Sequence, residues 1–123
     1  MRPLVIVDAA NVVGSVPDGW WRDRSGATER LRDSLAARAP ESLPGDLVLV
    51  VEGAARGVAS VDRVPVVAAS GSGDDAIVEL VRRSRAAEPE RDIVVVTADR
   101  GLRERVGALG ATVLGPSAVR SDG

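Results

Sequence analysis

The feature that most constrains the fold is a set of short aliphatic runs, three of which carry an acidic residue at their carboxyl end. These runs are apolar throughout instead of alternating with polar residues, which is typical of strands buried on both faces of a parallel sheet. We predict five strands, over residues 3–8, 46–53, 63–70, 92–99 and 111–116. Pro65 favours an edge position for the third strand, because proline cannot donate to a strand ladder.

Longer amphipathic segments separate the runs and predict three helices, over residues 25–40, 72–89 and 100–110. This alternation predicts an α/β fold, with a parallel sheet of about five strands and helices on both faces in a Rossmann-like, three-layer arrangement. Right-handed crossovers would place strands one and four side by side. We expect a single domain over residues 1–116 and a frayed tail over 117–123. The connection over 9–24 is expected to be a long loop that is either functional or mobile.

Three absences from the composition narrow the chemistry. The chain has no Cys and no His, and all 16 of its basic residues are Arg. These absences exclude a thiol nucleophile, a Ser-His-Asp triad, zinc held by Cys or His, a P-loop lysine and a Schiff-base lysine. Carboxylates remain as the main reactive groups, and carboxylates with water suit Mg²⁺ or Mn²⁺. The net charge of −2 argues against a strongly basic nucleic-acid-binding protein, although local basic patches remain compatible with it.

Acidic residues recur where the predicted strands end. Asp8, Glu52 and Asp99 close three strands, and Asp74 and Asp75 open the helix after the third strand. Because the carboxyl ends of parallel strands share one edge of a sheet, these side chains are expected to gather there. Crowded carboxylates repel one another unless a cation lies among them or some are protonated. The pattern therefore favours a metal site.

Helix capping is an alternative explanation for several of these acids. Ser72 and Asp75 have the spacing of a capping box, and Asp99 fits the N-cap of the following helix. Capping does not account for Asp8, because the following Ala-Ala-Asn-Val-Val does not predict a clear helix.

The segments VIVDAANVVGS, VVVEG, GSGDDAIVELV and VVVTADRGLRERV resemble the PIN-like superfamily of metal-dependent nucleases. The resemblance covers residues 4–114 and is closest to the NYN branch, which includes small YacP-type ribonuclease-like proteins. It implies that Asp8, Asp75 (or Asp74) and Asp99 hold Mg²⁺ or Mn²⁺. It also implies that Asn11 supports the first acid.

In the same family pattern, Thr97 orients the last acid and Glu52 stands where some members have a further acid. The chain is shorter than many PIN domains, so we expect a substrate-gripping helix to be missing. Because the chain has no lysine, we expect Arg side chains to contact the substrate phosphates.

The connection after Asp8 carries the only aromatic residues of the chain, Trp20 and Trp21, with Arg22 and Arg24 beside them. An exposed Trp can stack on a base, which contributes about 1–3 kcal/mol, and Arg can meet phosphates. Arg100, next to Asp99, is a further candidate for phosphate contact. The alternative is that the tryptophans fill the core, and we expect a division in which one packs and the other is partly exposed.

These observations predict a hydrolase: an endoribonuclease that cuts single-stranded RNA with water activated by metal at the strand-end carboxylates. One alternative is a nucleoside-triphosphate pyrophosphohydrolase or phosphatase using the same acids. That enzyme would need a closed pocket for one base, for which the sequence shows no second aromatic cluster. The other alternative is a non-catalytic RNA-binding module.

No run approaches the roughly 20 apolar residues of a membrane helix, and no signal peptide is recognisable. We therefore expect a cytoplasmic protein without a membrane partner. The sequence leaves open whether the protein forms a homodimer.

Overall fold

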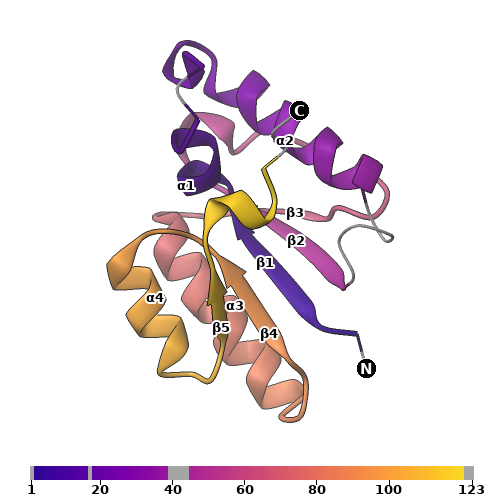
Figure 1. The fold of residues 1–123 in the computed structure, drawn as a ribbon, viewed down its shortest axis with the longest axis vertical. Coiled ribbons are helices and arrows are strands. Elements are labelled where there is room, and N and C mark those ends of the chain that lie inside the picture. Colours follow the sequence, from indigo (N-terminus) through magenta and orange to yellow (C-terminus); the bar gives the residue numbers. More distant parts are fainter. Residues whose placement is uncertain (1, 17, 39–44, 121–123) are drawn as a thin grey trace.

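The strand β1, Leu4–Asp8, lies at the centre of a five-stranded sheet in which every pairing is parallel. This computed structural model describes residues 2–16, 18–38 and 45–120. The strand order is β3-β2-β1-β4-β5 (Figure 1). The other strands are β2 (Asp46–Val51), β3 (Val66–Ala68), β4 (Ile93–Val96) and β5 (Thr112–Leu114). The predicted adjacency of strands one and four is confirmed, with Ile6 opposite Val95.

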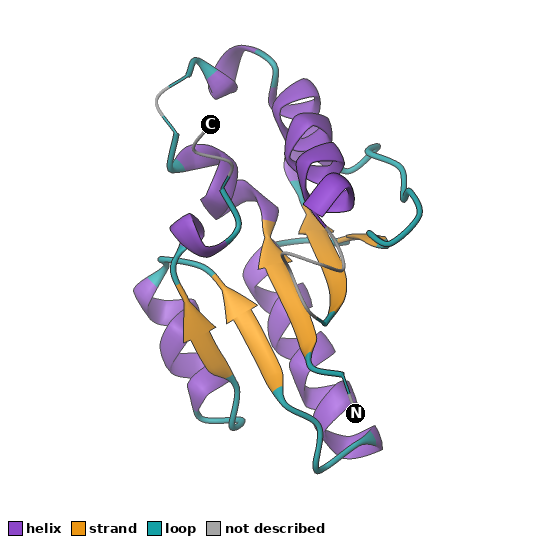
Figure 2. Cartoon of the chain, turned by 45° about the vertical axis from the view of Figure 1, so that its right-hand side comes forward, coloured by secondary structure: helices purple, strands orange, loops and turns teal. Residues whose placement is uncertain are grey.

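Helices cover both faces of the sheet, as expected (Figure 2). They are α1 (Ala9–Gly14), α2 (Arg24–Arg38), α3 (Gly73–Ala87) and α4 (Arg100–Gly107). Three short 3-10 turns complete the described elements: η1 (Trp20–Arg22), η2 (Gly53–Ala55) and η3 (Pro116–Ala118). The predicted α/β single-domain fold is therefore confirmed.

The alternation of side chains along β1 divides the core into two layers. Val7 faces the layer formed with α1 and α2, where Leu35 is fully buried. Ile6 faces the opposite layer, where α3 and α4 contribute Ile77 and Leu102. Burying an aliphatic side chain of this size contributes roughly 1.5–3 kcal/mol, so both layers hold the sheet in place.

The expectation of a long loop over 9–24 was wrong for its first part, because α1 begins directly after Asp8. Asp8 is the N-cap of this helix and accepts a hydrogen bond from the backbone N–H of Asn11. The two Val residues and Gly14 have weak helix propensity, but burial of Ala9 and Val12 in the core stabilises the turn.

Some predicted boundaries also differ from the structure. The third strand is only three residues long, although its edge position is confirmed. Pro40, the expected end of the first predicted helix, lies outside the described residues, and α2 is described to Arg38. The chain is not frayed from residue 117 to 120, because η3 brings Val119 into the core. None of the helices in the described ranges is long and apolar enough to span a membrane.

Candidate active site

The end of β1 places the Asp8 carboxylate at the carboxyl edge of the sheet, where the residue is only 4% exposed. Its Oδ2 accepts a 2.9 Å hydrogen bond from the Thr97 hydroxyl, and its Oδ1 accepts the Asn11 N–H at 3.4 Å. Burial raises the pKa of Asp8 from 3.8 to about 6. The two hydrogen bonds oppose this rise, and the negative charges of Asp74 and Glu52 add to it.

Thr97 connects the first acid to the last. Its fully buried hydroxyl donates to Asp8 and accepts the backbone N–H of Asp99 at 3.1 Å. The Asp99 carboxylate is the N-cap of α4, as predicted, and its Oδ1 accepts the N–H of Leu102 at 2.9 Å. The Asn11 side chain does not bond to Asp8. Its Oδ1 instead accepts the N–H of Ala98 at 2.7 Å, which fixes the turn between β4 and α4.

The neighbouring acids Asp74 and Asp75 have different surroundings. Asp75 is exposed and forms an ion pair with Arg105 at 3.0 Å, and its N–H is bound by the predicted N-cap, Ser72. Asp74 lies among the other acids. Burial, followed by the charges of Asp99 and Glu52, raises its pKa, while Arg105 lowers it. Asp74 thus interacts through its charge with Asp99 and Glu52, whereas Asp75 forms an ion pair with Arg105.

Glu52, at the end of β2, belongs to the same edge. Its Oε2 accepts the backbone N–H of Gly73 at 2.6 Å. A Cβ atom at Gly73 would lie 3.0 Å from the Glu52 carboxyl carbon, so glycine permits this close approach. Glu52 was outside our predicted catalytic set, although its place at a strand end matched that of the other acids.

The acids at this edge offer only oxygen ligands, which fits a hard divalent cation. Burial is the main cause of the raised pKa values of Asp8 and Asp74, and the neighbouring negative charges add to it; a cation would offset both contributions. In the side-chain arrangement of the described residues, no group of three or more acids forms a ready metal-binding set. The carboxylate oxygens are therefore suitable ligands for such a metal, but the acidic side chains would have to move closer together to bind it.

The two tryptophans divide as expected. Trp20 is half-buried beside Gly14, and Trp21 is 56% exposed. Their rings meet edge to face with centroids 6.1 Å apart. Arg24 lies over the Trp20 ring at 5.4 Å, and Arg22 lies over the Trp21 ring at 5.8 Å. Both contacts are of the cation–π type.

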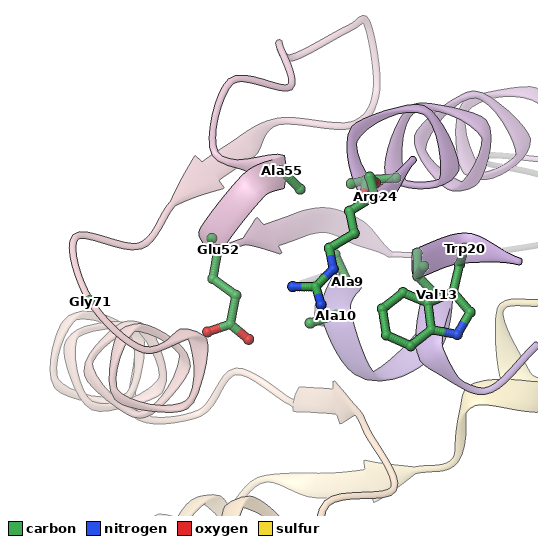
Figure 3. Close-up of a pocket in the computed structure, with 10 residues that line it drawn as sticks. Ala9, Ala10, Val13, Trp20, Arg24, Glu52, Ala55 and Gly71 are labelled. Carbon is green, nitrogen blue, oxygen red and sulfur yellow. Dashed lines mark hydrogen bonds between the residues drawn. The ribbon is translucent and has the colours of Figure 1, made fainter. Parts of the chain in front are cut away.

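A pocket of about 390 Å³ opens between this aromatic segment and Glu52 (Figure 3). It is lined by Ala9, Ala10, Val13, Trp20, Arg24, Thr28, Glu52, Gly53, Ala55 and Gly71. We did not expect a pocket large enough for one base, because the sequence shows no second aromatic cluster. The structure forms it instead from one tryptophan and small residues of several segments.

Arg100 does not line this pocket. It lies with Arg103, Glu104 and Val113 around a separate, shallow cavity beside β5. The structure therefore joins Asp8 to the turn of Asp99 through Thr97 and couples the charge of Asp74 to theirs, whereas Asp75 is paired with Arg105. Trp20 and Arg24 share the pocket with Glu52. Trp21 and Arg22 are exposed beyond the pocket, and Arg100 is on the β5 side of the acids.

Comparison with solved structures gives a clear likeness. A crystal structure of Rae1 (YacP) from Bacillus subtilis matches with a TM-score of 0.73, at 18% identity, over 94% of this chain and 70% of that chain. A tryptophan-to-leucine mutant of the same protein matches with a TM-score of 0.77, at 17% identity, over 95% and 72%. The chain has the fold of Rae1.

The expected resemblance to YacP-type proteins is thereby confirmed for the fold. More than a quarter of the Rae1 chain lies outside the match. No protein-family model matches the sequence, and neither does the sequence of any curated protein.

Proposed function

We propose that the protein is a metal-dependent nuclease, and that it acts as an endoribonuclease on single-stranded RNA in the cytoplasm. The observation that carries this proposal is the buried Asp8 carboxylate at the sheet edge, joined through Thr97 to the turn that bears Asp99 and facing the charge of Asp74. The Rae1 fold and the motifs that resemble ribonuclease-like proteins support it.

Asp8, Asp74 and Asp99 are our proposed ligands for Mg²⁺ or Mn²⁺. We rank Asp74 above Asp75, because Asp75 is already paired with Arg105. A bound divalent cation supplies a nucleophilic water at neutral pH and positive charge beside the phosphate. Asn11 and Thr97 act as positioning residues, because Asn11 ties α1 to the turn before Asp99 and Thr97 ties that turn to Asp8.

Substrate contacts are assigned to the residues around the acids. Trp21 offers an exposed ring on which an unpaired base can stack. Arg22 lies beside Trp21, and Arg100 directly follows Asp99, so their guanidinium groups can meet phosphates. Arg24 faces the pocket, where it can meet the nucleotide. A stacking surface suits single strands, whose bases are accessible, better than duplex RNA.

The test is cleavage of a labelled single-stranded RNA with Mn²⁺, with Mg²⁺ and with chelator. Asp8→Asn, Asp74→Asn and Asp99→Asn should each reduce the cleavage rate by about 100-fold or more, since each removes a ligand. Asp75→Asn is the matched control, because it removes the same charge one residue away, and it should remain within a few-fold of the parent. Metal-independent cleavage would contradict the proposal.

The pocket beside Glu52 favours hydrolysis of free nucleotides as a second candidate function. Its volume and its aromatic wall could hold one nucleotide next to the acids. Each nucleoside triphosphate should be assayed beside the RNA under the same conditions. Fast, chelator-sensitive triphosphate hydrolysis without RNA cleavage would reverse our ranking. RNA binding without either activity would favour the non-catalytic module.

A further inference from the structure

Two opposite charges face the pocket without pairing with each other. Glu52 stands on one wall, and Arg24 reaches in from the start of α2 (Figure 3). Within the described ranges, no ion pair joins these two side chains. Facing groups of this kind can be bridged by a ligand that offers hydrogen-bond donors on one side and acceptors on the other.

Arg24 is held in place without using its N–H donors. Its guanidinium lies 5.4 Å from the centre of the Trp20 ring. Its backbone carbonyl accepts a 2.8 Å hydrogen bond from the buried hydroxyl of Thr28, which steadies the start of the helix. No described residue accepts a hydrogen bond from the Arg24 side chain, so its donors remain available to a ligand.

Glu52 is likewise held in place, but only one of its two carboxylate oxygens accepts a hydrogen bond from the described part of the protein. The N–H of Gly73 occupies Oε2, and no described residue donates to Oε1. The walls between Glu52 and Arg24 include Ala9, Ala10 and Ala55, whose small side chains leave room for a flat ring. The pocket thus presents an acceptor, a set of donors and an apolar slot.

We propose that this pocket binds one unpaired guanine base of the RNA substrate. Guanine has an N1–H and an N2 amino group on one edge, which suit the Glu52 carboxylate. Its O6 and N7 acceptors suit the Arg24 guanidinium, as they do in the commonest Arg–guanine contact. Adenine offers the same side chains only its amino group and ring nitrogens, and uracil has a single N–H donor. The match is therefore best for guanine.

The position of the pocket relates base binding to the proposed chemistry. Ala9 and Ala10, two of its lining residues, directly follow Asp8, and Glu52 belongs to both the pocket and the acid edge. A nucleotide whose base occupies the pocket would hold its phosphodiester next to the acids. This inference rests on the proposed ribonuclease function and gives it a base preference.

The experiment measures binding in chelator, where cleavage does not interfere. Short oligouridylates with a single central G, A or C are titrated by calorimetry against the whole protein. The guanosine oligonucleotide should bind about tenfold more tightly than the others. Glu52→Gln should remove this preference, since the amide can still accept the Gly73 N–H but turns its NH₂ toward the guanine donors. The affinity for plain oligouridylate should not fall, because the variant removes a negative charge near the phosphodiester.

A second variant tests the pocket without altering charge. Ala10→Leu fills the slot from an exposed position and should abolish the guanine preference. Ala108→Leu is the matched control, because Ala108 is exposed at the end of α4 and does not line the pocket. It should keep the full preference.

Equal affinity for all the oligonucleotides, or no measurable binding of the guanosine one, overturns the inference even if RNA is cut. A guanine preference that survives both Glu52→Gln and Ala10→Leu overturns it as well. If the guanine preference is lost in the pocket variants but the protein cuts no RNA, base recognition is supported and the proposed ribonuclease activity is refuted.

Discussion

The hydroxyl of Thr97 donates a 2.9 Å hydrogen bond to Oδ2 of Asp8, between two strands that are neighbours in the sheet. The hydroxyl oxygen of Thr97 also accepts the backbone N–H of Asp99 at 3.1 Å. One buried hydroxyl therefore holds the first acid of the edge and the turn that carries the last.

Removing this hydroxyl should raise the pKa of Asp8 above about 6, because the bond favours the ionised carboxylate. Thr97→Val should show the rise, and Thr97→Ser, which retains the hydroxyl, should leave the pKa near that of the parent. The measurement is an NMR titration of the Asp8 carboxyl carbon. Thr97→Val should also lower the free energy of unfolding by about 1–3 kcal/mol, since polar groups lose buried partners. Equal pKa values in the two variants would contradict the role given to Thr97.

Stability should fall as the pH rises through the range in which Asp8 ionises. The folded-state pKa of about 6 lies above the unfolded value of 3.8, so the folded state binds more protons between these values. The contribution is therefore fully present below about pH 4 and is lost as the pH rises through 6, by roughly 3 kcal/mol at most. In Asp8→Asn, the free energy of unfolding measured by denaturation should depend less on pH between about pH 4 and 6. An identical slope in parent and variant between pH 4 and 6 would show that Asp8 does not titrate in this way.

Mn²⁺ should raise the melting temperature, because a ligand that binds only the folded state stabilises it, by about 2.7 kcal/mol at 100 times its Kd. Asp8→Asn and Asp74→Asn should lose most of the increase, and Asp75→Asn should keep it. Differential scanning calorimetry with and without the metal measures the effect. If Asp75→Asn lost the increase in melting temperature and Asp74→Asn kept it, Asp75 would be the metal ligand instead of Asp74.

Gly73→Ala should have opposite effects in two backgrounds. With Glu52 present, the new Cβ would lie 3.0 Å from its carboxyl carbon and should destabilise the protein or displace Glu52. With Glu52→Ala, the crowding is gone and the higher helix propensity of alanine should be gained, up to about 1 kcal/mol. A double-mutant cycle of unfolding free energies measures the coupling. Additive effects would contradict direct contact between the two residues.

The sheet and its acidic edge could be predicted because aliphatic runs ending in acids are a local pattern. The short helix α1 could not, because its Val-Val-Gly sequence has little helix propensity and its stability comes from the burial of Val12 in the core. For the same reason the capping role of Asp8 was missed.

The distinction between Asp74 and Asp75 could not be made from the sequence either. It depends on Arg105, a residue of a different helix that pairs with only one of them. The pocket escaped prediction because half of its ten lining residues are Ala or Gly, which carry no chemical signal until folding brings their segments together.

The strand order has a consequence for the time at which the acidic edge forms during synthesis. β1 can pair with β2 once the chain has reached Val51, but its other neighbour is β4, and the Thr97 that bonds Asp8 lies 89 residues further along the chain. A nascent chain on the ribosome thus exposes Asp8 long before Thr97 and Asp99 exist to complete its surroundings. A product terminated before Thr97 would lack the proposed catalytic centre, so the proposed cutting of RNA could begin only after most of the domain had been made.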